Sequence, residues 1–293
     1  MGSLSARALR RTAEQWRAGG RHALVISVDE IKGSTPRDTG TRMLVSAAEV
    51  DGTIGGGHLE WQAIDLARHA LQENTRALSP WTRAFALGPT LGQCCGGVVT
   101  LRFAPLDEST LSSWTLPAPR FHLELHGAGH VGQAIIRLLL DLDCTVRWID
   151  ERADKDYSAS LPKAEQPGLP SEAMLTSLPP HIQWLDTDAA EHEVLDAPPG
   201  ACHLVLTHRH DLDLRIIDAV LRRGDFSFAG LIGSQTKRAK FLRRLTEQGI
   251  APEALARLTC PIGLPGLEGK EPAVIAIAVL AQLLQHTSSL QQN

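Results

Sequence analysis

The stretch GAGHVG at residues 127–132 limits the fold of this chain more than any other part of its sequence. This G-x-G-x-x-G pattern follows an expected strand, opens an expected helix and precedes a second expected strand that ends at Asp150. Gly127 permits a tight turn, Gly129 lets a phosphate approach the backbone, and Gly132 lets the helix pack closely on the strand. The spacing therefore predicts the first β-α-β unit of a Rossmann-like, doubly wound parallel sheet.

The same turn is a candidate anion site. A helix that starts at such a turn offers free N–H groups and the positive end of its dipole. Asp150 could accept a hydrogen bond from a ribose hydroxyl, as in dinucleotide-binding folds. Two interpretations stay open: the turn binds a nucleotide, or its glycines serve only the packing of helix against strand.

The sequence divides into two regions joined by a segment that contains several prolines. We expect an α/β protein with a mixed α+β domain over 1–107, a linker over 108–119 and a parallel-sheet domain over 120–293. A crossover loop is expected over 151–180. The hydrophobic patterns predict helices over 4–18, 58–74, 213–223 and 235–248 and after Pro272, and strands over 22–30, 42–46, 81–87, 98–104, 121–126, 181–186, 202–208 and 226–234.

Composition argues against several classes of partner. The net charge is −4 and aromatic residues make up 4% of the chain, which disfavours a nucleic-acid surface and a basic membrane patch. The longest apolar run, 273–284, is too short to cross a bilayer, so we expect a buried helix there. The N-terminus lacks the apolar core of a secretory signal, so the five cysteines are expected to be reduced thiols in the cytoplasm.

Two adjacent cysteines, Cys94 and Cys95, lie in the stretch LGQCCGG at 91–97. A disulfide between neighbours is strained and disfavoured in the cytoplasm, and a zinc site would need about four ligands. The thiols either pack as small apolar groups, or bind a soft transition metal or transfer sulfur. We favour Cys95 for the chemical role, because the two glycines that follow it leave its thiol more open.

A second glycine-rich loop carries Gly55, Gly56 and Gly57 directly before a helix whose first turn contains His58. Three successive glycines cost backbone entropy, and packing alone rarely requires them. They indicate close approach by a ligand or by another backbone. If this loop converges with 32–46 and with the cysteine loop, the N-terminal domain has a pocket lined by glycines and thiols.

The stretch THRHDLD at 207–213 follows an expected strand of the parallel sheet. His208 and His210 alternate along an expected extended segment, so they would face the same way. A metal-dependent hydrolase site would add Asp211 or Asp213, but no third histidine completes the pattern. The other interpretations are contact with a ligand without a metal, and loop groups that cap a helix starting near Asp213.

Two helix starts in the C-terminal half are further candidate anion sites. Ser234 is expected to cap a helix whose first turn carries Lys237, a charge that opposes the helix dipole unless an anion lies nearby. The alternative is a solvated basic face. Lys270 precedes the helix that begins near Pro272, but Glu271 stands where a Walker A sequence has Ser or Thr. ATP hydrolysis is therefore unsupported.

These stretches together resemble the XdhC/CoxI family of xanthine dehydrogenase accessory proteins. The resemblance runs along nearly the whole chain, and the adjacent cysteines and the long C-terminal motif favour its XdhC branch. The stretches that carry it are GSTPRDTGTRMLV, GTIGGGHLE, QCCGG, HGAGHVG, THRHDLD, IGSQTKRAKF and CPIGLPGLEGKEPAVIAIAVLAQLL.

The resemblance implies a maturation factor rather than an enzyme. Proteins of this family bind the molybdenum cofactor, a pyranopterin with a dithiolene and a terminal phosphate. They hold it while a cysteine desulfurase replaces an oxo ligand by sulfido, and they help insert it into the molybdenum subunit of xanthine dehydrogenase, an enzyme of purine catabolism. The resemblance also implies a cytoplasmic homodimer with an N-terminal XdhC/CoxI domain and a C-terminal Rossmann domain.

The motifs and the resemblance together select a set of candidate residues. Cys95, with Cys94, is the candidate molybdenum contact. The residues expected to bind the cofactor are Gln93, Cys94, Cys95, Gly55, Gly56, Gly57, His58, Gly127, Gly129, His130, Gly132, His208, His210, Ser234, Lys237 and Lys270. The alternative function is an NAD(P)-dependent oxidoreductase that uses the glycine turn at 127–132 and Asp150.

Overall fold

The structure is a computed structural model that describes residues 5–35, 37–73, 78–87, 97–152 and 168–290. The chain forms two compact units, Met1–Ala118 and Pro119–Asn293. The candidate residues Gln93, Cys94 and Cys95 lie outside the described residues.

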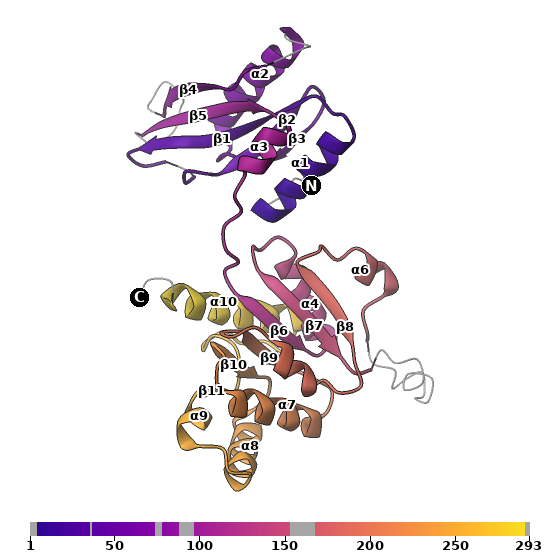
Figure 1. The fold of residues 1–293 in the computed structure, drawn as a ribbon. Helices are drawn as coiled ribbons and strands as arrows, with labels where there is room; N and C mark the ends of the chain where they lie inside the picture. Colours follow the sequence, from indigo (N-terminus) through magenta and orange to yellow (C-terminus); the bar gives the residue numbers. More distant parts are fainter. Residues whose placement is uncertain (1–4, 36, 74–77, 88–96, 153–167, 291–293) are drawn as a thin grey trace. The chain divides into compact units, whose positions relative to one another are not determined.

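The first unit is built around a five-stranded antiparallel sheet with the order β3-β2-β1-β5-β4 (Figure 1). Alternate residues of β1 point to its two faces: Leu24 and Ile26 pack with α2, whereas Val25 packs with α1 and α3. The sheet is therefore covered by helices on both sides. The elements are α1 (Ala6–Ala18), β1 (Ala23–Lys32), β2 (Arg42–Ser46), β3 (Val50–Gly52), α2 (Gly57–Glu73), β4 (Trp81–Ala86), β5 (Val98–Pro105) and α3 (Glu108–Ser113).

The segment 108–119, expected to be a linker, differs in the structure because half of it is folded. Asp107 caps α3 by accepting a hydrogen bond from the Thr110 N–H at 2.7 Å. Leu111 and Trp114 are buried in the same apolar cluster as α1. This burial makes α3 part of the first unit.

The second unit is a six-stranded parallel sheet with the order β11-β10-β9-β6-β7-β8. The chain adds β7 and β8 on one side of β6 and β9 to β11 on the other, which confirms the predicted doubly wound class. The elements are β6 (His122–His126), α4 (His130–Leu139), β7 (Thr145–Asp150), α6 (Glu172–Thr176), β8 (Ile182–Asp186), η2 (His192–Asp196), β9 (Cys202–Val205), α7 (His210–Arg223), β10 (Phe228–Leu231), α8 (Gln235–Glu247), α9 (Pro252–Ala256), β11 (Leu258–Thr259) and α10 (Pro272–Leu290).

Two apolar clusters hold helices on the two faces of this sheet. One cluster contains residues of α4 and α10, and the other contains residues of α7 and α8. By length and composition α10 is a candidate membrane span. However, Ala276, Val279 and Leu283 of α10 are buried in the core of the unit, as predicted for a buried helix. Cys144, Cys202 and Cys260 are buried and form no disulfide among the described residues.

The structure differs from the sequence-based expectation at two places in this unit. Helix α6 lies within 151–180, where a crossover loop was expected. Helix α7 begins at His210 rather than near Asp213, so the prediction of an extended segment through His210 is wrong. The added turn is apolar on its inner side, where Leu212 and Leu214 are buried.

Two buried histidines lie next to each other on neighbouring strands of the parallel sheet. The rings of His126 on β6 and His203 on β9 stack with centroids 5.8 Å apart. Neither ring nitrogen of His126 has a hydrogen-bond partner among the described residues. Burial lowers the pKa of His126 well below its ordinary value. Burial, and then the charge of the nearby Arg223, lower the pKa of His203 to about 4. Both rings are therefore neutral near pH 7.

This pair predicts that the second unit loses stability in acid. The unfolded chain protonates both histidines below about pH 6.5, whereas the folded chain holds the pKa of His203 at about 4 and that of His126 well below its ordinary value, so stability is lost as the pH falls below about 6.5. His126→Leu and His203→Leu should each flatten the pH dependence by up to about 1.4 kcal/mol per pH unit. Urea unfolding from pH 7 to pH 5 measures this. The exposed-residue control His192→Asn should keep the wild-type slope, and equal slopes in all variants would contradict the account.

Candidate functional site

The candidate site of the second unit lies where the strand order reverses, between β6 and β9. Open parallel sheets bind ligands at this point, beyond the carboxyl ends of the strands. Three segments leave the sheet there: 127–129 after β6, 150–152 at the end of β7 and 206–209 after β9. We call them the switch-point loops.

The three glycines of the GAGHVG turn have different roles. A Cβ on Gly127, whose φ is +121°, would lie 2.4 Å from the carbonyl oxygen of Leu206. A Cβ on Gly132 would lie 2.2 Å from the carbonyl oxygen of Gly127. A Cβ on Gly129 would meet nothing within 4 Å among the described residues. Packing therefore requires Gly127 and Gly132, whereas Gly129 faces open space that a ligand can enter.

Asp150 is already occupied by groups of its own chain. Its Oδ2 accepts hydrogen bonds from the Ala128 N–H at 2.6 Å and from Arg152 Nη2 at 2.7 Å. Its Oδ1 accepts from the Arg152 N–H at 2.9 Å and from Arg152 Nε at 2.8 Å. Asp150 and Arg152 are only 4% and 3% exposed, and the four bonds use the acceptor positions of a carboxylate. The expected ribose contact at Asp150 is therefore wrong for this conformation.

The start of α4 has no side-chain cap among the described residues. Gly129 is the N-cap and has no side chain to accept from the first-turn N–H groups, and Asp150 binds the N–H of Ala128 instead. His130 is exposed at the first helical position, and a Cβ on Gly168 would lie 2.8 Å from its Nε2. The uncapped turn and the space beside Gly129 fit an anion.

Histidines and an ion-pair chain follow β9. Burial, and then the charge of Arg152, lower the pKa of His208, so its imidazole is neutral near pH 7. Arg209 Nη2 lies 2.8 Å from Glu151 Oε1, which connects the loop after β9 to the end of β7. His210 is exposed as the first residue of α7. The structure thus places His208 near the charges of Asp150 and Arg152 at the end of β7. His208 and His210 do not form the predicted extended pair, because His210 belongs to α7.

The charge of Lys237 is paired with a buried aspartate, Asp213, rather than with a ligand anion. Its Nζ lies 2.6 Å from Asp213 Oδ2 and donates to the Ile232 carbonyl oxygen at 2.8 Å. Oδ1 of Asp213, which is fully buried, accepts from the Thr207 N–H at 3.0 Å and from its hydroxyl at 2.7 Å. Ser234 caps α8 as predicted, accepting from the Lys237 N–H at 3.2 Å. Neither a bound ligand nor a solvated face is needed to explain Lys237.

These contacts remove the proposed hydrolase site. Asp213 binds Thr207 and Lys237 rather than facing His208 and His210. Within the described ranges, no group of three His, Cys, Asp or Glu side chains is placed to hold a metal ion. Lys270 is exposed just before α10 begins at Pro272.

The triple glycine of the first unit is explained by a loop that closes on its own carboxylate. Gly55, Gly56 and Gly57 have φ values of +126°, +75° and +66°. Oε2 of Glu60 accepts from the Ile54 N–H at 3.1 Å, the Gly56 N–H at 3.0 Å and the Thr53 hydroxyl at 2.5 Å. The N–H groups of Ile54 and Gly56 are therefore bound within the chain itself. Among the described residues, a Cβ on Gly56 would meet nothing within 4 Å, and the close approach of a ligand or another backbone to this loop stays a prediction.

The strand registers bring two of the three loops predicted to converge to the same end of the sheet, whereas the cysteine loop lies outside the described residues. The end of β1, the start of β5 and the end of β4 lie together, and the start of β2 pairs with the end of β3 at the same end of the sheet. A Cβ on Gly97 would lie 2.5 Å from the Ser34 carbonyl oxygen, so two of the loops touch. We call the described residues 33–35, 37–41, 53–57 and Gly97 the three-loop end. The Leu87 N–H donates to the Gly97 carbonyl oxygen there.

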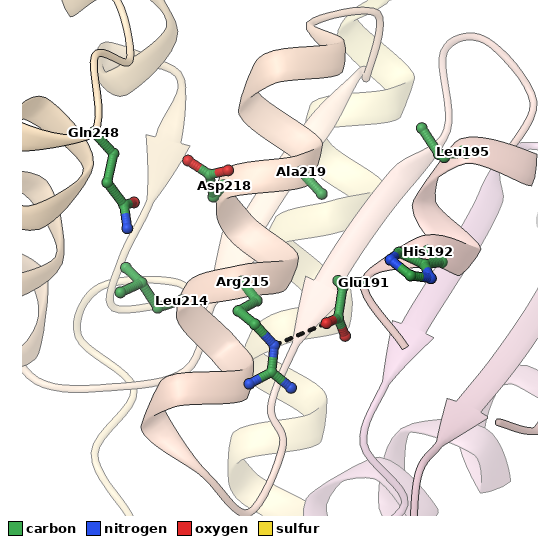
Figure 2. A pocket seen from close by; sticks show the side chains of 8 residues that line it. All are labelled: Glu191, His192, Leu195, Leu214, Arg215, Asp218, Ala219 and Gln248. Carbon is green, nitrogen blue, oxygen red and sulfur yellow. Dashed lines mark hydrogen bonds and ion pairs between the residues drawn. The ribbon is translucent and has the colours of Figure 1, made fainter. Parts of the chain in front are cut away.

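A cavity of about 320 Å³ lies between η2 and α7, and Figure 2 shows that Arg215 reaches across it to Glu191 at 2.9 Å. Its residues were not expected from the sequence, because only the packing of η2 on α7 brings them together. They are Glu191, His192, Leu195, Leu214, Arg215, Asp218, Ala219 and Gln248.

The buried pair of Asp213 and Lys237 predicts strong energetic coupling between the loop after β9 and α8. Lys237→Met or Asp213→Asn alone should cost about 3–5 kcal/mol, because each leaves a buried polar or charged group without its partner. The double variant should cost less than the sum, by about 1–3 kcal/mol. Urea unfolding of the four proteins measures this. Arg222→Met, at an exposed arginine paired with Asp218, is the control with little expected change. Additive costs would contradict the coupling.

Comparisons with known proteins agree with both units. A family model described as the XdhC Rossmann domain matches residues 123–283, and one described as the XdhC and CoxI family matches 16–80. "Uncharacterized protein YqeB" of Escherichia coli (strain K12) is 31% identical over 256 residues, which are 87% of this chain and 41% of that protein. The chain thus spans about two-fifths of that relative's length.

A solved structure has the same fold. A crystal structure described as a xanthine dehydrogenase from Bacillus halodurans aligns with 99% of this chain and 96% of its own chain, with a TM-score of 0.68 and 17% identity. The GAGHVG turn, the parallel sheet and most of the second unit fall within the matched Rossmann model, which covers more than half of the chain. The chain therefore belongs to the XdhC/CoxI family.

Proposed function

We propose that this chain is an accessory chaperone that binds the molybdenum cofactor as cargo, protects it during sulfuration and promotes its insertion into xanthine dehydrogenase. The observation that carries the proposal is the contrast between two neighbours at the switch-point loops. Gly129 leaves space for an anion at the start of α4, which has no side-chain cap among the described residues. Asp150 is bound to Arg152, although a dinucleotide would need this carboxylate for its ribose. This arrangement suits a ligand that ends in a phosphate and carries no second ribose.

The phosphate of the cargo fits the start of α4. The first-turn N–H groups and the helix dipole favour a dianion. The neutral imidazole of His208 lies in the field of Arg152 and can donate or accept a hydrogen bond beside it. Packing already requires Gly127 and Gly132, so Gly129 is the glycine of this turn that is left for ligand approach.

The residues proposed to contact molybdenum are two thiols of the first unit. Cys95, with Cys94 and Gln93, lies in the sequence between Leu87 and Gly97, outside the described residues. Thiolates suit a soft metal with sulfur ligands. The proposed partners are the molybdenum subunit of xanthine dehydrogenase and a cysteine desulfurase, and the proposed working form is a cytoplasmic homodimer that turns over no substrate of its own.

The cysteine role predicts the outcome of reconstitution. Apo-dehydrogenase, molybdenum cofactor and wild-type chain should give active enzyme, whereas Cys95→Ala should reduce the yield at least tenfold and Cys94→Ala less. Burial raises the pKa of Cys202 to about 11, so its thiol stays protonated near pH 7 and Cys202→Ala is the matched control. Wild-type activation by the double Cys94 and Cys95 variant would contradict the thiol role.

The phosphate site predicts a separation of binding from stability at two glycines. Gly129→Ser should fold normally, because serine is a good N-cap and the added atoms enter open space. Its hydroxyl would take the N–H groups offered to phosphate, so cofactor affinity should fall about tenfold. Gly127→Ala should instead destabilise the unit, because its Cβ would overlap Leu206. Calorimetry and thermal unfolding measure both; undiminished cofactor binding by Gly129→Ser would place the phosphate elsewhere.

A further inference from the structure

An aromatic pair on α2 has no role in the core of the first unit. Trp61 is 62% exposed, although α2 buries Leu59 and Ala63 against the sheet. The rings of Trp61 and His58 stack with centroids 5.6 Å apart and an angle of 21° between their planes. An indole this exposed gains little from its own fold, because most of its apolar surface remains in water.

The pair is held in place before any ligand binds. His58 Nε2 lies 3.1 Å from Gln62 Nε2, one helical turn further on, which fixes the imidazole. Glu60 lies between the two rings in sequence, and its carboxylate anchors the first turn of α2 to the N–H groups of Ile54 and Gly56. The platform therefore loses little conformational entropy when another ring stacks on it.

The pair also lies beside the three-loop end. Helix α2 begins at Gly57, five residues after β3 ends at Gly52, so its first turn is at the end of the sheet where the loops converge. The loop it leaves has open space at Gly56. A ligand held at that end of the sheet would have the rings of His58 and Trp61 within a few residues of its binding loop.

The geometry points to the His58–Trp61 pair as a stacking platform for a planar nitrogen heterocycle. The identity of that ring rests on the proposed function: the ring is the planar pyrimidinone part of the pterin of the cargo. Aromatic side chains bind planar nitrogen rings by their π-faces, and loss of such a platform costs about tenfold in affinity. The pair would orient the organic part of the cofactor.

The test is a binding titration of the full chain with two probes, the isolated molybdenum cofactor under anaerobic conditions and 6-hydroxymethylpterin, which has neither metal nor phosphate. Trp61→Ala should weaken cofactor binding about tenfold, and Trp61→Phe should restore most of it. Leu195→Ala removes another exposed apolar side chain, 70% exposed in the second unit, and should change nothing. Thermal unfolding should be alike for all variants, because neither Trp61 nor Leu195 is buried.

The possible outcomes separate the platform from the proposed function. Equal cofactor binding by wild type and Trp61→Ala overturns the platform and leaves the chaperone proposal standing. Absence of cofactor binding by wild type, with Trp61-dependent binding of the pterin, overturns the chaperone proposal and keeps a heterocycle site. Absence of binding to both probes overturns both. A Trp61→Ala variant that binds cofactor normally but no longer activates the dehydrogenase would make Trp61 a protein contact and also overturn the platform.

Discussion

The buried carboxylate of Asp150 is the interaction on which the switch-point loops depend. It holds the N–H of Ala128 inside the glycine turn and the guanidinium of Arg152 at the end of β7, so one side chain ties two neighbouring strand ends together. Removing it would leave Arg152, which is 3% exposed, as a buried charge without its partner. The shape of the turn, and with it the open approach at Gly129, follows from this contact.

The same device recurs at the other loops. Glu60 closes the triple-glycine loop through the N–H groups of Ile54 and Gly56, and Asp213 joins Thr207 to Lys237. In each case an internal carboxylate binds donors in or beside a stretch that the sequence analysis marked as a candidate site. The loops are thereby formed in advance, which reduces the entropy lost on binding. The donors that remain at the start of α4 are then the natural place for an anion.

The sequence predicted the parallel sheet and the β-α-β unit because the GAGHVG spacing, the strand before it and the strand after it are local features. It also predicted the Ser234 cap, which depends on neighbouring residues. It missed the partners of Asp150, Glu60 and Lys237, because these bonds depend on where separate loops meet after folding. Helix α3 was not predicted, because the prolines around it indicated a linker. The first turn of α7 was not predicted, because its histidines suggested an extended loop.

We propose that the switch-point loops accept a phosphate-bearing cofactor and not a dinucleotide. Anaerobic calorimetry of the full chain with the molybdenum cofactor, and in parallel with NAD(H) and NADP(H), tests it most directly. We expect saturable binding of about one cofactor per chain and no binding of either dinucleotide at millimolar concentration. Saturable dinucleotide binding without cofactor binding would contradict it, because Asp150 would then have to release Arg152 to accept a ribose.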